Sequence, residues 1–343
     1  MKKVTIKEVA ELANVSKSTV SQYLNNRFDY MGVETKKKIE SVIEELSYQP
    51  NIVARSLRQK STTTIGVIVA NILHEFSTQI IRAIEDQCNE YGYHIIVCNA
   101  DDNSNKEKEY INTLIAKQVD GIISLPTGKN TKLYEEMNQS GFPIVFLDRR
   151  VQDLPINSIL LDNEAASQLA VKEFSRNGYK KISAFFTYPS EDVTPRQERL
   201  KGLKKALKKY NLKEDPDFIH VLQVEEVQPE LTKIFTSSNR PEAILAMNDR
   251  ILVEILKFLK KSSLKIPEDV GIIGIDDVSF AKFYSPSITT IAQPTFEMGR
   301  AAAKLLIKNI LGEEISVSEE EQRFEPKLVV RESCEKLKDI DIL

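Results

Sequence analysis

The sequence predicts a small all-α head followed by a larger α/β body of two lobes. Three short amphipathic helices account for the first 60 residues, and past residue 65 apolar runs of four to six residues alternate with amphipathic helices. This alternation is typical of parallel sheets that are covered by helices on both faces. The chain has 343 residues, and the part after the head is too long for one sheet, so we expect two lobes.

Residues 5–24 are predicted to form two helices around a tight turn. Thr5 and Ser16 are favourable N-cap residues, and apolar residues follow each of them at helical spacing. Asn14 lies between them, where the turn favours a residue that tolerates the left-handed region. A third helix over 33–46 would give this pair a hydrophobic core. The pattern favours a helix-turn-helix over the alternative of a plain helical hairpin.

The second helix presents short polar side chains that are suited to base edges and phosphates. Residues 1–60 contain 11 Lys and Arg against 7 Asp and Glu, whereas the remainder contains 36 against 43. A basic head on an acidic body is typical of DNA-binding proteins, although solvated helices also carry such an excess. The head residues expected to contact DNA are Thr5, Ser16, Lys17, Ser18, Thr19, Ser21, Gln22 and Asn25.

In the body, amphipathic helices are clearest at 77–91 and 196–210, where apolar residues recur every three or four positions. In open α/β sheets, ligands bind in the crevice outside the carboxyl ends of the strands. Polar residues at these ends are therefore candidates for a binding site. The expected strands are 65–70, 94–99, 121–125, 144–147, 158–161, 182–186, 243–247 and 271–275.

Motifs of the common enzyme classes are absent from the sequence. No two of the 12 glycines are separated by a single residue, which excludes G-x-G-x-x-G, and no P-loop, G-x-S-x-G or H-E-x-x-H motif occurs. The three histidines have no ligand-like spacing, and Cys88, Cys98 and Cys334 include no C-x-x-C pair. We therefore expect no catalytic site, metal or cofactor, against the alternative of an enzyme on an α/β body.

The sequence also argues against a membrane or secreted protein. Its longest apolar stretches run for about six residues, far short of the ~20 that span a bilayer. Lys2, Lys3 and Lys7 interrupt any signal peptide. This predicts a cytoplasmic protein with reduced thiols and no membrane partner. It disfavours the second alternative, a pure solute-binding protein.

The segment VTIKEVAELANVSKSTVSQYLNN, followed by ETKKKIESVIEELSYQPNIVARSL, resembles the head of the LacI/GalR family of transcription regulators. The resemblance continues through IGVIVANI, VDGIIS, ILLDNEAAS, AILAMND, IPEDVGIIGIDD and SITTIAQP. It implies a DNA-binding head at 1–60 with a hinge helix at about 51–59. It also implies an effector-binding and dimerisation domain at 61–343, whose two lobes are similar to a periplasmic sugar-binding protein. The implied ligands are operator double-stranded DNA and a small sugar or sugar acid.

In the hinge, the resemblance implies DNA contacts by Asn51, Ala54 and Leu57, with Leu57 inserted between base pairs in the minor groove. The alternative is a plain linker in which Leu57 packs on the body. Gln22 stands where the family often has arginine, which predicts a different operator base. The tail at 331–343 is too short for a helical tetramerisation segment, so a homodimer is expected.

The resemblance also assigns effector contacts to residues at or near strand ends. From the residues alone, Asp148 and Asp276 are equally compatible with helix caps, and Asp277 is expected to be one. The contacts implied by the family are Asp148, Arg199, Asn248 and Asp276, with Phe76 and Ser124 as weaker candidates.

Arginines beyond the family pattern indicate the chemistry of the effector. Arg149 and Arg196 are expected to join Arg199, and two or more arginines in one cleft suit a carboxylate. TVSQYLN and TPRQERLKGL look similar to regulators of pectin or hexuronate breakdown, which predicts repression of sugar-acid catabolism genes and an effector such as 2-keto-3-deoxygluconate. The alternative is that Arg149 and Arg150 pair with Asp153 or other surface carboxylates.

Overall fold

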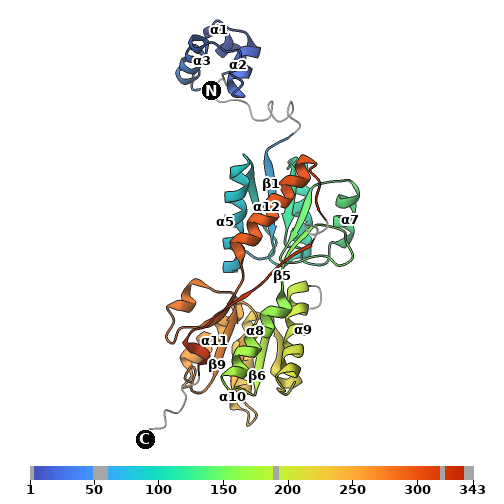
Figure 1. The fold of residues 1–343 in the computed structure, drawn as a ribbon, viewed down its shortest axis with the longest axis vertical. Coiled ribbons are helices and arrows are strands. Elements are labelled where there is room, and N and C mark those ends of the chain that lie inside the picture. The colour runs from blue at the N-terminus through green and yellow to red at the C-terminus, as the bar shows by residue number, and fades with distance from the viewer. Residues whose placement is uncertain (1–3, 49–60, 188–192, 317–320, 336–343) are drawn as a thin grey trace. The chain divides into compact units, whose positions relative to one another are not determined.

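The computed structural model describes residues 4–48, 61–187, 193–316 and 321–335 (Figure 1). The chain divides after Thr62 into two compact units, a head and a body. The hinge residues Asn51, Ala54 and Leu57 lie outside the described residues, so their predicted contacts with DNA stay predictions.

The described residues of the head form three helices, α1 (Ile6–Leu12), α2 (Lys17–Leu24) and α3 (Val33–Glu45). They enclose a small core in which Val20 and Ile39 are fully buried. The predicted third helix and its core are therefore confirmed.

Local chemistry explains where the first two helices begin. Thr5 and Glu8 form a capping box at the start of α1. The Ser16 hydroxyl accepts a hydrogen bond from the Thr19 amide at 3.1 Å, which caps α2. Asn14 has a φ of 52° in the turn between them. The helix-turn-helix predicted from these positions is confirmed.

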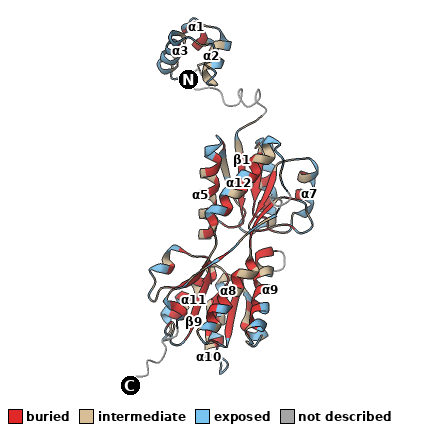
Figure 2. Ribbon diagram, in the orientation of Figure 1, coloured by how far each residue is buried: buried red, intermediate tan, exposed pale blue. Residues whose placement is uncertain are grey.

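In the part of the body that the structure describes, there are two six-stranded sheets, one in each lobe, and both are buried between helices (Figure 2). In the first lobe α5 and α12 pack side by side on one face, and α6 and α7 cover the other. The strand order is β11-β5-β4-β3-β1-β2. The elements are β1 (Thr64–Val69), α5 (Glu75–Glu90), β2 (His94–Asn99), α6 (Ser104–Ala116), β3 (Gly121–Ser124), α7 (Thr131–Gln139), β4 (Ile144–Leu147), β5 (Ser158–Leu161), α12 (Thr295–Leu311) and β11 (Glu321–Phe324).

The second lobe repeats this plan with strand order β12-β10-β9-β8-β6-β7. Helices α8 and α9 cover one face of its sheet, and α10 and α11 cover the other. Its elements are α8 (Asn163–Arg176), β6 (Ile182–Thr187), α9 (Thr194–Lys209), β7 (Ile219–Leu222), α10 (Val227–Thr236), β8 (Ala243–Ala246), α11 (Asp249–Lys261), β9 (Gly271–Ile275), β10 (Thr289–Ala292) and β12 (Lys327–Val329).

The body chain crosses between the lobes after β5, after β10 and between β11 and β12. The chain leaves the second lobe after β10 and re-enters it just before β12, so these two strands pair in antiparallel fashion. The other described strand pairs are parallel. The two predicted parallel sheets are confirmed with this one exception. Because all three crossings pass between the lobes, they frame any cavity there.

No helix in the described ranges is long and apolar enough to cross a membrane. The same ranges contain no group of three or more His, Cys, Asp or Glu residues placed to hold a metal ion.

Candidate functional site

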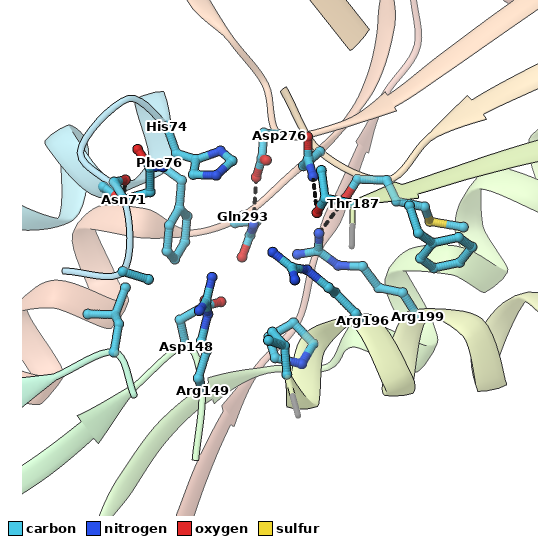
Figure 3. A pocket seen from close by; sticks show the side chains of 18 residues that line it. Asn71, His74, Phe76, Asp148, Arg149, Thr187, Arg196, Arg199, Asp276 and Gln293 are labelled. Atoms are coloured by element: carbon cyan, nitrogen blue, oxygen red, sulfur yellow. Dashed lines mark hydrogen bonds and ion pairs between the residues drawn. The ribbon is translucent and has the colours of Figure 1, made fainter. Parts of the chain in front are cut away.

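A cavity lies between the lobes, at the carboxyl ends of strands from both sheets (Figure 3). Gln293, in the second crossing, contributes to its lining. The first lobe contributes Ala70, Asn71, His74, Phe76, Ser77, Leu125, Asp148 and Arg149, and the second contributes Phe186, Thr187, Val193, Pro195, Arg196, Arg199, Met247, Asn248 and Asp276.

The structure brings seven of the eight predicted effector residues together in this cavity. Ser124 is the exception, because it is fully buried and its hydroxyl lies 2.6 Å from the Tyr134 hydroxyl, away from the lining. Helix α5 begins at Glu75, two residues before the expected start, so Phe76 lies on the helix and not in a loop. The seven residues in the lining are Phe76, Asp148, Arg149, Arg196, Arg199, Asn248 and Asp276.

Asp148 and Asp276 follow β4 and β9, and both have left-handed backbones, with φ of 64° and 85°. This conformation costs free energy for a residue other than glycine, and such strained residues cluster at functional sites. Neither residue is the N-cap of a described helix. Asp277 does not cap one either, so that expectation is wrong. Its carboxylate instead accepts hydrogen bonds from Arg331 at 2.7 Å and from Thr290 at 2.6 Å.

Two arginines of the lining are held in place by hydrogen bonds or ion pairs with neighbouring residues of the body. Arg199 donates from Nε to Asn163 Oδ1 at 2.8 Å and from Nη1 to the Met247 carbonyl at 2.5 Å. Arg149 pairs through Nη1 with Asp102 at 2.7 Å. Its Nε is buried without a hydrogen-bond partner among the described residues.

Arg150, by contrast, does not line the cavity. Its guanidinium pairs with Glu321 at 2.5 Å and not with Asp153, the partner suggested by the sequence. The surface pairing that we considered for Arg149 and Arg150 therefore describes Arg150 alone, with a different carboxylate.

Burial and charge shift the pKa values of the groups in this cavity. Burial, reinforced by the Arg149 and Arg199 guanidinium groups, lowers the pKa of Arg196 to about 10. Burial raises the pKa of Asp148. It raises the pKa of Asp276 to about 6, with a further contribution from Asp249. The cavity therefore crowds positive charge beside α9 and makes two of its carboxylates costly to ionise.

Sequence reasoning missed five polar residues of the lining, which are Asn71, His74, Ser77, Thr187 and Gln293. His74 Nδ1 lies 2.5 Å from Asp249 Oδ1, which joins α5 of one lobe to α11 of the other. Gln293 donates from Nε2 to Asp276 at 2.5 Å, while its Oε1 is buried without a partner among the described residues. An unpartnered buried acceptor in a cavity is a position for a ligand hydroxyl. The only signal in the sequence was the position of Gln293 after an apolar run and before a proline.

In the head, the predicted DNA-contacting side chains gather on α2. Lys17, Ser18 and Gln22 are exposed. The Ser16 hydroxyl lies within 2.6 Å of Ser18 Oγ and 2.8 Å of Thr19 Oγ1 at the helix N-terminus. Ser21 and Asn25 are half-buried, and Thr5 caps α1. This helix terminus presents the hydroxyls, amides and dipole that bind phosphate.

Replacing Asp276 with Asn is expected to stabilise the effector-free body near neutral pH. The raised pKa means that the folded chain holds this proton more tightly than the unfolded chain. The carboxyl therefore destabilises the fold increasingly as the pH rises from about 4 to about 6 and fully above that, and the effect disappears well below pH 4, where both states are protonated. We expect a gain of about 1–3 kcal/mol in the free energy of unfolding near pH 7, because one pKa unit corresponds to about 1.4 kcal/mol.

Urea unfolding of Asp276→Asn at several pH values measures this gain. Asp277→Asn is the matched control: although burial opposes it, hydrogen bonding to Arg331 lowers the pKa of Asp277, so this change is expected to destabilise at neutral pH. Equal stability of Asp276→Asn and the unaltered protein near pH 7 would contradict the account.

Comparisons with known proteins agree with this architecture. Residues 5–51 match the family described as bacterial regulatory proteins, lacI family, and residues 171–334 match a periplasmic binding protein-like domain. The chain is 46% identical to the probable HTH-type transcriptional regulator EndR of Paenibacillus polymyxa, covering 97% of this chain and 99% of that protein. It is 35% identical to the HTH-type transcriptional regulator KdgR of Bacillus subtilis (strain 168), covering 96% and 97%.

Among solved structures, a lac repressor dimer bound to operator and the anti-inducer ONPF matches with a TM-score of 0.85 and 25% identity, covering 97% of this chain and 99% of that one. Both relatives are transcriptional regulators, and this chain matches each of them over nearly its whole length. This chain therefore belongs to the lacI family of DNA-binding bacterial transcription regulators.

Proposed function

We propose that this regulator is a repressor whose affinity for operator DNA is controlled by a small effector in the cavity between the lobes. The observation that carries the proposal is the convergence of polar side chains from both lobes and from a crossing segment on one cavity. A ligand that contacts both lobes favours one lobe arrangement over another. Operator and effector then alter each other's affinity by the same factor.

We further propose that the effector is a sugar acid and that the genes repressed serve sugar-acid catabolism. The two hydrogen bonds of Arg199 described above end on neutral oxygens, and the pKa of Arg196 is lowered by burial and by two neighbouring guanidinium groups. Asp102 pairs with Arg149, and its charge, together with that of Asp148, offsets part of this effect on Arg196. A ligand carboxylate beside α9 would add negative charge next to Arg149, Arg196 and Arg199, and hydroxyls suit Asp276 and Gln293.

Calorimetry against paired ligands tests the effector class. The pairs are galacturonate with galactose and glucuronate with glucose, together with 2-keto-3-deoxygluconate. We expect at least one acid to bind about a hundredfold more tightly than its neutral partner, since charge-assisted hydrogen bonds to a buried arginine contribute about 2–3 kcal/mol. A neutral sugar that binds as tightly as its acid contradicts the sugar-acid proposal.

In the head, we propose that α2 enters the major groove and that Gln22 reads a base edge. Glutamine makes a bidentate contact with adenine, whereas arginine prefers guanine, and each pair gives about 1–3 kcal/mol of discrimination. Gln22→Arg is therefore expected to change one position in each half of the preferred operator. Selection of operators from a random DNA pool with both proteins measures this. Identical consensus sequences would show that Gln22 contacts only phosphate or water.

We propose a cytoplasmic homodimer, which binds a near-palindromic operator because the two-fold axis relates both heads. Exposed apolar side chains on the body support a second copy: Leu73 is 70% exposed and Phe283 is 78% exposed. Leu73, Val253 and Phe280 also line a shallow groove where α5 meets α11. A partner would remove this apolar surface from water.

A further inference from the structure

Behind the cavity, Arg199 is connected to a series of hydrogen-bonded side chains that leads to the other lobe. Its Nε donates to Asn163 Oδ1 at 2.8 Å, and Asn163 Nδ2 donates to Glu198 Oε2 at 3.2 Å. Asn163 is almost completely buried and is the first residue of α8, directly after the first crossing between the lobes. The amide thus has its oxygen on the arginine and its nitrogen on the carboxylate, the one orientation that satisfies both neighbours.

The Glu198 carboxylate is in turn held at both oxygens by Arg323. The two Arg323 Nη atoms lie 3.1 and 3.0 Å from Glu198 Oε2 and Oε1. Glu198 belongs to α9 in the second lobe, whereas Arg323 belongs to β11 in the sheet of the first lobe. Arg323 Nη1 and Asn163 Nδ2 also both approach the Leu161 carbonyl, at 3.3 and 3.4 Å. A bidentate arginine–carboxylate pair therefore joins the lobes next to Asn163.

We propose that Asn163 is a positioning residue for effector recognition, because it fixes the orientation of Arg199. The Glu198–Arg323 pair makes this hydrogen bond between Asn163 and Arg199 depend on the arrangement of the lobes. The inference rests on the proposed function of the cavity. A neutral amide fixes the direction of the Arg199 guanidinium without cancelling its charge, which stays available to an anionic ligand. A carboxylate at the same position would accept the same hydrogen bond but would compensate the arginine internally.

This arrangement couples ligand binding to lobe movement in a specific way. If β11 moves relative to α9, the bidentate pair breaks, and the Glu198 carboxylate that anchors Asn163 Nδ2 is no longer held in place by Arg323. The orientation of the Arg199 guanidinium in the cavity is then less restricted. Conversely, a ligand that holds Arg199 favours the lobe arrangement in which Asn163, Glu198 and Arg323 are connected.

Hydrogen exchange at the Arg199 Nε–H, followed by NMR on the full chain labelled with ¹⁵N-arginine, tests the positioning without any ligand. The signal is assigned by its disappearance in Arg199→Lys. We expect Asn163→Ala to accelerate exchange about tenfold, the effect of one hydrogen bond, and Arg323→Ala to accelerate it about fivefold. Lys201→Gln is the matched control, because Lys201 also joins α9 to α8, through Glu164 at 2.6 Å, and is expected to leave exchange unchanged.

Ligand affinity distinguishes a positioning role from a merely structural one, because a merely structural role of Asn163 would leave this affinity unchanged. With the tightest-binding acid of the calorimetric panel, Asn163→Ala and Asn163→Asp are both expected to weaken binding about tenfold. Asn163→Asp keeps the Arg199 Nε–H protected, while Asn163→Ala does not. Unchanged exchange in Asn163→Ala overturns the positioning role, and unchanged exchange in Arg323→Ala overturns the link between the lobes. Absence of binding by every panel member to the unaltered protein refutes the proposed effector class instead, and the exchange rates still decide the positioning.

Discussion

A body of residues 63–343 without the head is expected to bind operator DNA at least about a thousandfold more weakly than the full chain, while it binds the effector unchanged. Specific affinity exceeds non-specific affinity by about a thousandfold or more, and we expect the contacts that supply it to come from the head. Residues 61–343 contain 36 Lys and Arg against 43 Asp and Glu, so the body repels the phosphate backbone. Fluorescence anisotropy with labelled operator and calorimetry with effector measure the two affinities.

The control is the full chain in the same buffer, since salt alone changes DNA affinity by orders of magnitude. The compact contacts of the body after Thr62 make it a suitable fragment. If the fragment were to bind operator as tightly as the full chain, the assignment of DNA binding to residues 1–60 would be wrong.

Arg196→Gln is expected to weaken binding of the acid effector about a hundredfold, with little change for a neutral sugar. Arg196 lines the cavity and its side chain has a lowered pKa, so it places a half-buried positive charge there. Loss of one partner from a buried charge pair costs about 2–5 kcal/mol, most of it in the dissociation rate. Calorimetry and stopped-flow dissociation measure both quantities.

Arg176→Gln is the matched control, because Arg176 lies on α8 of the same lobe, with its side chain 65% exposed, and pairs with Glu173. It is expected to leave the affinity unchanged. Arg149→Gln should lose less affinity than Arg196→Gln, because Asp102 already compensates Arg149. If both cavity variants bind the acid as tightly as the unaltered protein, the sugar-acid proposal fails while membership of the family stands.

Much of the fold was predictable because buried parallel strands consist of short runs of apolar residues, which are visible in the sequence. All eight expected strands are present, with ends shifted by at most one residue. Of the four described strands that were missed, β7, β11 and β12 lie at sheet edges, and β10 lies next to the edge strand β12. The burial of β7 and β11 alternates or is partial, so polar residues interrupt their pattern. β10 is rich in threonine, and β12 has three residues, too few for a period to appear.

The site was less predictable because its geometry arises where distant segments meet. The strand-end position of Asp148 and Asp276 fitted a binding site and a helix cap equally well, and only the family resemblance favoured the site, where both residues lie. Ser124 occupies a similar place in the sequence, but its side chain points toward Tyr134 on the other face of the sheet. The contacts of Arg149 with Asp102 and of Arg199 with Asn163 depend on packing between segments 36 or more residues apart. No local period encodes such contacts.

The measurement that tests the account most directly is the full linkage cycle between operator and effector. Operator affinity is measured by anisotropy with and without saturating acid, and acid affinity is measured by calorimetry with and without saturating operator. The account predicts that each ligand changes the affinity for the other by the same factor, of about 5–150-fold. If both ligands bind and neither changes the affinity for the other, the cavity does not control DNA binding and the central claim is contradicted.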